Sequence, residues 1–345
     1  MRDSHTYPFT AIVGQDEMRE ALVLNTVYPE IGGVLIRGEK GTAKSTTVRA
    51  LAGLLPDRRV VRGCTCGCTW GDWDSVCPEC RERLSSGTPE AETVPMKVVE
   101  LPLSSTEDRV AGTMDLEHAI STGRKRFEPG ILAKANGNIL YVDEVNLLDD
   151  HIVDLLLDAA AMGVNYIERE GISYSHPSRF MLVGTMNPEE GDLRPQLLDR
   201  FGLMVEVAGE KEEGRRMEVI RRRMEFERDP ETFCERYVAG ESELRDRIVE
   251  ARNIVKEMEP GDDVLRAAVG ISLHLGVEGH RADLTMVRTA CARAALDGRE
   301  SPTPRDVAAI SRMVLSHRMR RDPFQESGLD EEGLEQWMNG FLDTL

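Results

Sequence analysis

The stretch Gly38–Ser45, which reads GEKGTAKS, decides how the rest of this chain is interpreted. An apolar run at 34–36 precedes it, and apolar residues at helical spacing between 48 and 55 follow it. Strand, glycine loop and helix in this order are typical of a phosphate-binding loop, because backbone N–H groups and a helix N-terminus attract anions. The residues predicted to surround the phosphates are Gly38, Glu39, Lys40, Gly41, Thr42, Ala43, Lys44, Ser45 and Thr46.

Two side chains of this loop have specific predicted roles. Lys44 would contact the β- and γ-phosphates of ATP, and the Ser45 hydroxyl would hold Mg²⁺. The residue before the lysine is glycine in the usual pattern but is Ala43 here, and its methyl group restricts the loop. The alternative is a chance glycine turn before a helix.

A second motif strengthens the phosphate-loop interpretation. Four apolar residues at 139–142 are followed by two carboxylates, Asp143 and Glu144. This pattern is typical of the carboxyl end of a central strand in a parallel sheet. Asp143 suits a Mg²⁺ contact and Glu144 suits activation of the attacking water. The alternative is an acidic helix cap, which the upstream phosphate loop makes less attractive.

Two more segments extend the predicted site. A buried strand predicted at 180–184 ends near Asn187, whose amide could orient water against the γ-phosphate or form an Asx turn. Residues 12–15 lead into a helical pattern beside the loop, and Val13 is predicted to lie over the base of the nucleotide; the alternative is a plain N-terminal helix.

Composition restricts the class of protein. A length of 345 residues suggests about two domains, and an apolar fraction of 41% is ordinary for a globular protein. The N-terminus has no apolar stretch of a signal peptide and no run of about 18 apolar residues occurs, so we expect a cytoplasmic protein. A net charge of −18 disfavours a general nucleic-acid binder, which needs a basic face.

Five of the seven cysteines fall between positions 64 and 80. Four thiolates can form a tetrahedral zinc site, and Cys77-x-x-Cys80 is a natural half of one, whereas C-x-C-x-C is an irregular other half. An iron–sulfur cluster is a weaker option, and unmetallated, redox-sensitive thiols are the alternative. Without metal we expect this stretch to be poorly ordered, since it lacks apolar periodicity. The candidate ligands are Cys64, Cys66, Cys68, Cys77 and Cys80.

The remaining patterns predict an α/β region followed by helices alone. We expect a buried strand at 98–102, a weak helical pattern from 114 to 120, a turn at 125–130 and short helices at 131–135 and 193–201. A hairpin is predicted at 164–175 and a last strand at 204–207. From 210 onward the patterns are helical, at 211–228, 242–258, 264–275, 284–296, 306–320 and 331–342.

The order of these motifs resembles that of AAA+ ATPases of the helix-2-insert type and, more narrowly, the small ATPase subunit of magnesium chelatase. The resemblance covers nearly the whole chain, through 7–15, 138–157 (NILYVDEVNLLDDHIVDLLL), 168–172, 187–201 and 315–323. It implies an AAA+ P-loop α/β sandwich with a parallel sheet plus a C-terminal all-helical domain. The implied domains are a nucleotide-binding domain at 1–209, a helical linker at 210–260 and a lid domain at 261–345. The first of them would contain a Cys-rich insertion at 62–95 and a helix-2 insert at about 104–127.

The resemblance also implies roles for single residues and an assembly. The protein would form a ring, expected to be a hexamer, with ATP between neighbouring subunits. Asn187 matches the sensor-1 position, Arg200 an arginine finger acting on the next subunit's ATP, and Arg281 the sensor-2 arginine. Cations that reach the γ-phosphate would stabilise the charge of phosphoryl transfer.

The partners implied are a larger AAA+ subunit with an integrin-like metal domain and a large porphyrin-binding subunit. ATP hydrolysis would then drive metal insertion into a tetrapyrrole that this chain does not itself bind. The alternatives are an ATPase subunit of a cobalt or nickel chelatase and a MoxR-like remodelling chaperone. A nucleic-acid motor is disfavoured by the net charge, and a purely structural nucleotide binder would be indifferent to Glu144→Gln.

Overall fold

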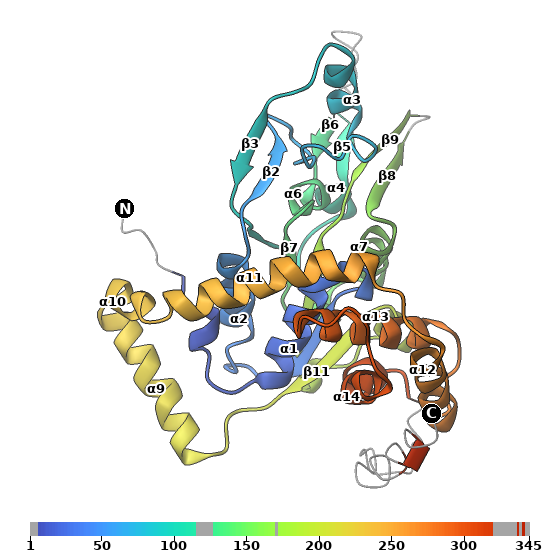
Figure 1. The fold of residues 1–345 in the computed structure, drawn as a ribbon. Coiled ribbons are helices and arrows are strands. Elements are labelled where there is room, and N and C mark those ends of the chain that lie inside the picture. The colour runs from blue at the N-terminus through green and yellow to red at the C-terminus, as the bar shows by residue number, and fades with distance from the viewer. Residues whose placement is uncertain (1–5, 115–126, 170–171, 320–336, 338–339, 342–345) are drawn as a thin grey trace. The chain divides into compact units, whose positions relative to one another are not determined.

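The computed structural model describes residues 6–114, 127–169, 172–319, 337 and 340–341 (Figure 1). The chain divides into two compact units. The first unit comprises Met1–Gly14, Gly38–Asp192 and Ala208–Ser242, and the second comprises Gln15–Arg37, Leu193–Val207 and Glu243–Leu345. Each unit therefore combines segments that are far apart in the sequence.

The first unit contains three parallel strands with β7 in the middle. β7 (Ile139–Val142) pairs on one side with β4 (Val98–Glu100) and on the other with β10 (Met181–Met186). Every residue of β7 and β10 is buried. Uninterrupted apolar runs are what strands covered on both faces require, so the predicted central strand and parallel sheet are confirmed.

Helices of the first unit begin and end where local signals predict. α2 (Lys44–Leu54) starts inside the glycine loop, and α6 (Ile131–Ala135) has the predicted bounds. α7 (Asp150–Met162) ends at Gly163, whose φ of +68° provides the left-handed C-cap that glycine accommodates. The predicted hairpin is confirmed as β8 (Val164–Arg169) and β9 (Ile172–Pro177), and its turn at 170–171 lies outside the described residues.

Two predictions for this unit are wrong in part. The strand predicted as buried at 98–102 is the edge strand β4, which ends at Glu100 and is only half-buried. The turn predicted at 125–130 contains β6 (Phe127–Pro129), which pairs antiparallel with β5 (Gly112–Met114) after the short helix α4 (Glu107–Ala111). Most of the weak helical pattern and much of the helix-2 insert fall at 115–126, outside the described residues.

The Cys-rich insertion has secondary structure that the sequence analysis missed. β2 (Arg58–Val61) pairs antiparallel with β3 (Ala91–Val94), and α3 (Pro78–Ser85) lies between them in the chain. β2 begins with two arginines instead of an alternating pattern, so its strand character depends on the distant partner β3.

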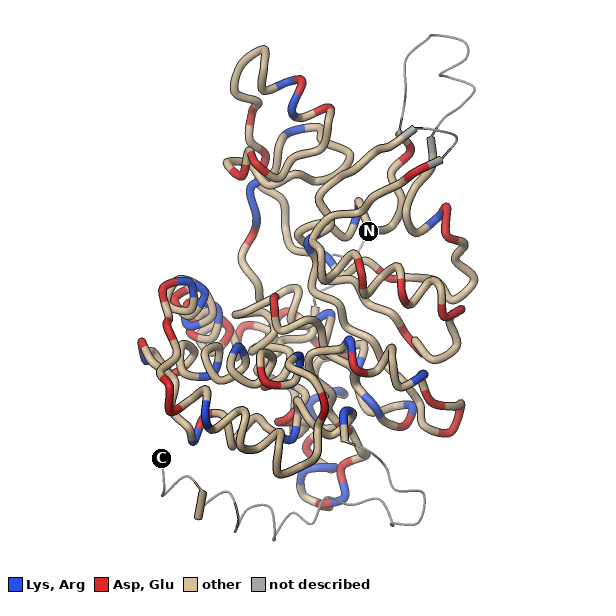
Figure 2. The backbone as a smooth tube through the Cα atoms, turned by 90° about the vertical axis from the view of Figure 1, so that its right-hand side faces the viewer, with Lys and Arg blue, Asp and Glu red and all other residues tan. Residues whose placement is uncertain are grey.

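The first unit ends with charged helices. α9 (Glu213–Arg228) has no buried residue, and α10 (Pro230–Glu235) follows it. Arg221 and Arg222 both pair with Glu218, and Arg223 pairs with Glu227. The run of arginines therefore belongs to a solvated helix face, and Figure 2 shows acidic and basic residues interspersed along the described chain.

The second unit combines early strands and helices with the C-terminal helices. β11 (Leu203–Val207) lies beside β1 (Val34–Gly38) and packs against α1 (Asp16–Val27). A short helix, α8 (Pro195–Leu198), precedes β11. Three helices pack on one another, α12 (Asp262–His274), α13 (Arg281–Leu296) and α14 (Pro304–Leu315), after the long α11 (Val238–Ile254).

Boundaries in the second unit depart modestly from prediction. α14 ends at Leu315, earlier than the predicted 320, and the helix predicted at 331–342 lies almost wholly outside the described residues, as do positions 320–323 of the resemblance. No helix in the described part of the chain is both long and apolar enough to cross a membrane. Short 3-10 turns occur at Phe9–Ala11, Pro29–Ile31, Val145–Leu147, Pro188–Glu190 and Val255–Glu257.

Candidate nucleotide-binding site

The glycine loop connects the end of β1 to the start of α2. Gly41 has a φ of +84°, and Ala43, the N-cap of α2, has a φ of +61°. The Ala43 carbonyl accepts hydrogen bonds from the Thr47 backbone N–H at 2.9 Å and hydroxyl at 3.0 Å. The position before the lysine therefore requires the left-handed conformation that glycine adopts freely, and alanine occupies it at a cost.

Lys44 is the first residue of α2, and its ammonium group lies over the loop. Its Nζ donates to the carbonyls of Gly38 at 2.6 Å and Glu39 at 2.7 Å. Burial lowers the pKa of Lys44, while the negative charges of Asp143 and Glu144 oppose that shift. The predicted phosphate-binding lysine and the two predicted carboxylates are therefore close enough to interact electrostatically.

Asp143 follows β7 and is held by two neighbouring hydroxyls. Its Oδ1 accepts from the Thr185 hydroxyl at 2.6 Å and from the Tyr141 hydroxyl at 3.0 Å. The Thr185 oxygen also accepts from the Glu144 backbone N–H at 3.1 Å. Ser45 lies half-buried on the first turn of α2, and Thr46 follows it. A serine hydroxyl and an aspartate carboxylate are the oxygen ligands that Mg²⁺ prefers, so these residues fit the ion.

Glu144 has an unusual backbone and a cationic partner. Its φ of +55° is uncommon for a residue other than glycine. Its Oε1 lies 3.0 Å from Nζ of Lys40, and the same Nζ lies 2.7 Å from Oε1 of Glu190. Hydrogen bonds to Glu190 and Glu144 raise the pKa of Lys40. No sequence pattern connects Glu190 to a lysine 150 positions earlier in the chain, so this pairing could not be predicted.

Asn187 lies directly after β10, where the sequence predicts it. Its side chain is buried, and its Oδ1 accepts from the Glu189 backbone N–H at 3.3 Å as the cap of the turn Pro188–Glu190. The structure therefore contains the Asx-type turn that the sequence analysis gave as an alternative, and the role of the amide in orienting water stays a prediction. Val13 lies half-buried in the N-terminal segment of the same unit, where η1 (Phe9–Ala11) packs against α2.

Arg200 and Arg281 belong to the second unit. Arg281 pairs with Asp199, the residue before Arg200, at 2.7 Å between Nη1 and Oδ2. Arg318, whose side chain is 2% exposed, pairs with the other oxygen of Asp199 at 3.1 Å. The Arg318 guanidinium also donates to the carbonyl of Phe201 at 2.6 Å. The backbone on both sides of the predicted arginine finger is thus fixed by an arginine that the sequence analysis did not single out.

The five clustered cysteines do not behave alike. Four sulfur atoms lie within 4.8 Å of one another, those of Cys64, Cys68, Cys77 and Cys80. The thiol of Cys66 instead faces the Tyr174 hydroxyl at 3.9 Å. All five are free thiols.

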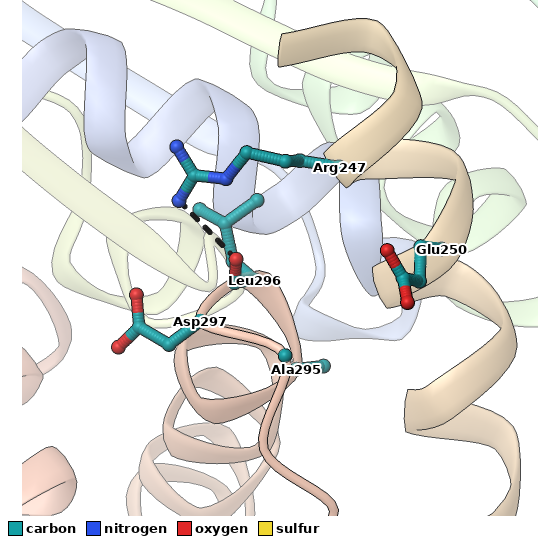
Figure 3. Close-up of a pocket in the computed structure, with 6 residues that line it drawn as sticks. Arg247, Glu250, Ala295, Leu296 and Asp297 are labelled. Carbon is teal, nitrogen blue, oxygen red and sulfur yellow. Dashed lines mark hydrogen bonds between the residues drawn. The ribbon is translucent and has the colours of Figure 1, made fainter. Parts of the chain in front are cut away.

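One further hollow lies among helices of the second unit. Figure 3 shows Arg247 and Glu250 from α11 facing the end of α13, where the Arg247 guanidinium donates to the Leu296 carbonyl at 3.2 Å. Asp297 adds a second carboxylate to its rim. This hollow contains none of the residues predicted for the site.

The phosphate loop before α2, the carboxylates after β7 and the helical C-terminal region define a P-loop ATPase of the AAA+ class. Residues 82–201 match the AAA domain family (dynein-related subfamily), and residues 265–337 match the AAA lid domain family.

Similar proteins define the family more closely. A magnesium-chelatase subunit ChlI homolog of Methanocaldococcus jannaschii is 55% identical, with 98% of this chain and 92% of that protein covered. The magnesium-chelatase 38 kDa subunit of Acidiphilium rubrum is 51% identical, with 93% of each covered. A cryo-EM-based structure of the complex between subunits BchI and BchD of magnesium chelatase matches with a TM-score of 0.54 and 45% identity, covering 96% of this chain and 99% of that chain. This chain belongs to the family of magnesium-chelatase ChlI subunits.

Proposed function

We propose that this protein is the ATPase motor subunit of a magnesium-chelatase-type complex. The observation that carries the proposal is the extent of the similarity, since relatives named as this subunit match almost end to end at about half identity. In this proposal the chain forms a cytoplasmic ring, a hexamer, that hydrolyses ATP between neighbouring subunits. Its partners are a larger AAA+ subunit with an integrin-like metal domain and a large subunit that binds the porphyrin.

The residues of the first unit have distinct roles in this proposal. The loop Gly38–Ser45 encloses the phosphates and Lys44 contacts the β- and γ-phosphates, while Val13 lies over the base. Ser45 and Asp143 would hold Mg²⁺, which neutralises charge on the phosphates when it is bound. Glu144 accepts a proton from the attacking water, and Asn187 orients that water. The hydrogen bonds from Tyr141 and Thr185 support this assignment because they fix the carboxylate of Asp143.

The cations of the second unit complete the proposed mechanism. Arg200 would reach the ATP of the adjacent subunit, so that hydrolysis depends on assembly, and Arg281 would act as sensor 2. The pairing of Arg281 with Asp199 supports a linkage between the two arginines, because a movement of Arg281 toward phosphate would release Asp199.

The domains in this proposal are 1–209, 210–260 and 261–345, and the lid-family match at 265–337 supports the last of them.

Reconstitution tests the proposed function. The full chain is mixed with its two partner subunits, Mg²⁺ and a porphyrin, and metal insertion is followed by the fluorescence of the magnesium product with and without ATP. We expect insertion to require ATP and to be lost with Lys44→Ala, while Lys134→Ala, which changes an exposed lysine of the same unit, leaves it intact. Insertion that proceeds equally without ATP would contradict the proposal.

The same assay separates the alternatives. ATP-dependent insertion of Co²⁺ or Ni²⁺ in place of Mg²⁺ would identify a different chelatase. ATP hydrolysis that no porphyrin-binding subunit and no porphyrin affects would favour a MoxR-like remodelling chaperone. The named magnesium-chelatase relatives favour neither alternative.

A further inference from the structure

The thiol cluster lies in the insertion between β2 and β3. Cys64 and Cys68 belong to the loop after β2, Cys77 is the N-cap of α3, and Cys80 lies in the first turn of that helix. Three of these four side chains are buried and Cys64 is half-buried. Two short segments, each with two thiols, therefore converge on one point.

The distances between the sulfur atoms fit a tetrahedral metal better than any disulfide. Zn–S bonds of about 2.3 Å in tetrahedral geometry place neighbouring sulfurs about 3.8 Å apart. The Cys64 and Cys77 sulfurs lie 3.8 Å apart, and all four lie within 4.8 Å of one another. A disulfide requires about 2.05 Å, so this pair is not bonded. A disulfide joins two sulfurs, whereas four sulfurs lie close together here.

Cys66 lies beside the cluster, where its thiol interacts with those of Cys64 and Cys77, but it is not one of the four mutually close sulfurs. Its sulfur lies 3.9 Å from the Tyr174 hydroxyl, and its carbonyl accepts from the Asn136 amide at 3.0 Å. Removing Cys66 from the ligand set changes the first pair from the irregular C-x-C-x-C to Cys64-x₃-Cys68. The complete pattern is then C-x₃-C followed by C-x₂-C, and both intervals fall within the spacing usual for zinc ligands.

The surroundings of the sulfurs match those of a bound thiolate. The Cys77 backbone N–H donates to the Cys68 sulfur at 3.2 Å, which is the kind of hydrogen bond that orients a metal ligand. The buried guanidinium of Arg58 approaches the loop at Gly67, and its Nε and Nη1 have no hydrogen-bond partner among the described residues.

Apart from the pairing of β2 with β3, the apolar core of the insertion is small. Its own buried residues are largely the cysteines themselves, with Val61 and Val76, packed against a few apolar side chains from outside the insertion such as Phe127 and Ile167. So small a core stabilises few residues, and small modules of this kind commonly depend on a metal. Tyr174 stacks on Phe127 and donates to Glu79 at 2.7 Å, which connects α3 to the hairpin β8–β9.

We propose that Cys64, Cys68, Cys77 and Cys80 bind one structural Zn²⁺ and that Cys66 is not a ligand. The ion closes the insertion by joining the loop after β2 to the start of α3. The coordination is complete with four protein sulfurs, so the site has no open position for catalysis. This inference is independent of the proposed function, because the cluster makes no use of ATP or of a partner subunit.

Metal analysis of the full chain tests the site. The protein is purified under reducing, oxygen-free conditions, exposed to excess Zn²⁺, desalted and analysed by elemental mass spectrometry. We expect about one zinc per chain for the wild type and for Cys66→Ser, and less than about a tenth of that for Cys80→Ser. Replacement with Co²⁺ should give the intense visible absorption of tetrahedral cobalt thiolate, unchanged in Cys66→Ser.

The named outcomes decide between the alternatives. A wild-type chain that keeps no zinc after this treatment overturns the proposal, as does iron with sulfide and the brown absorption of an iron–sulfur cluster. Equal loss of zinc from Cys66→Ser and Cys80→Ser overturns the ligand set. Circular dichroism and ATP turnover of each variant, measured in parallel, show whether the rest of the chain is folded, so that loss of metal is not confused with global unfolding.

Discussion

Ala43 and Glu144, both at the candidate site, are two of the three described residues other than glycine with a positive φ. The left-handed conformation costs such a residue about 1–2 kcal/mol. It persists only where surrounding contacts enforce it, and such residues cluster at functional sites. At Ala43 the first turn of α2 provides those contacts, and at Glu144 they come from Thr185 and Lys40.

Glu144 is the residue on which turnover is expected to depend most directly. Glu144→Gln keeps the shape of the side chain but removes the proton acceptor, so we expect ATP hydrolysis to fall about 10²- to 10⁴-fold. ATP binding, measured with a fluorescent analogue, should persist. Glu190→Gln is the matched control, because Glu190 contacts the same lysine, and it should retain turnover. If Glu144→Gln hydrolyses ATP normally, Glu144 is not the base.

His317 is expected to make stability depend on pH. Its Nε2 lies 3.0 Å from the Phe201 carbonyl, and burial together with repulsion from Arg318 lowers the pKa of His317 to about 3. An unfolded histidine has a pKa of about 6.5, so between these values the unfolded state binds more protons, and stability is lost as pH falls.

The expected contribution of His317 is a loss of about 1.4 kcal/mol of unfolding free energy for each pH unit below about 6.5. Urea unfolding at several pH values in this window measures it. His317→Gln keeps an N–H donor for the Phe201 carbonyl but does not titrate, so its stability should fall less steeply with acid. If the unfolding free energies of the wild type and His317→Gln fall equally steeply with decreasing pH, His317 is already protonated in the folded state.

At the scale of elements, Arg318 joins the end of the α14 region to the segment between α8 and β11. Its guanidinium pairs with Asp199 and donates to the Phe201 and Gly202 carbonyls. Arg318→Met removes this donor from both carbonyls, and among the described residues only that of Phe201 keeps a partner, His317. We therefore expect a loss of about 1–3 kcal/mol for each buried acceptor that stays unsatisfied.

The consequence for activity follows from the same contacts. Since Arg318 fixes the backbone on both sides of Arg200, Arg318→Met should also reduce ATP turnover at temperatures where the chain stays folded. Arg312→Met is the control, because Arg312 lies on α14 and is half exposed, and a change of less than about 0.5 kcal/mol is expected there. Differential scanning calorimetry and phosphate release measure the two effects, and equal behaviour of the two variants would contradict the linkage.

At the scale of the whole molecule, the proposed mechanism places Glu144 and Arg200 of one site on two different subunits. Arg200→Ala and Glu144→Gln should each be inactive as pure proteins. In a randomly mixed ring of equal parts, about a quarter of the sites combine an intact Glu144 with a neighbour's intact Arg200. We therefore expect mixing to restore up to about a quarter of wild-type phosphate release. No recovery, in rings shown by light scattering to be mixed, would contradict an arginine finger supplied in trans.

Much of the candidate site could be predicted from the sequence because its parts are local. The loop Gly38–Ser45, the carboxylates after β7 and Asn187 after β10 each occupy a fixed place relative to the end of an adjacent strand. An apolar run followed by a polar residue identifies the end of a strand, and this pattern is visible without knowing which strand pairs with it. The short helix α6 has the predicted bounds, whereas β2, β5 and β6 depend on antiparallel partners that no local pattern indicates.

The sequence by itself therefore determined the phosphate loop, the acidic strand end and the family, because each is written in contiguous residues whose spacing sets backbone geometry. Only the tertiary structure decided that Lys40 bridges Glu144 and Glu190, that Arg318 supports the segment around Arg200, and that four of five thiols converge while Cys66 turns to Tyr174. Those pairings join residues separated by up to about 150 positions, and only the packing of the chain brings such residues within bonding distance.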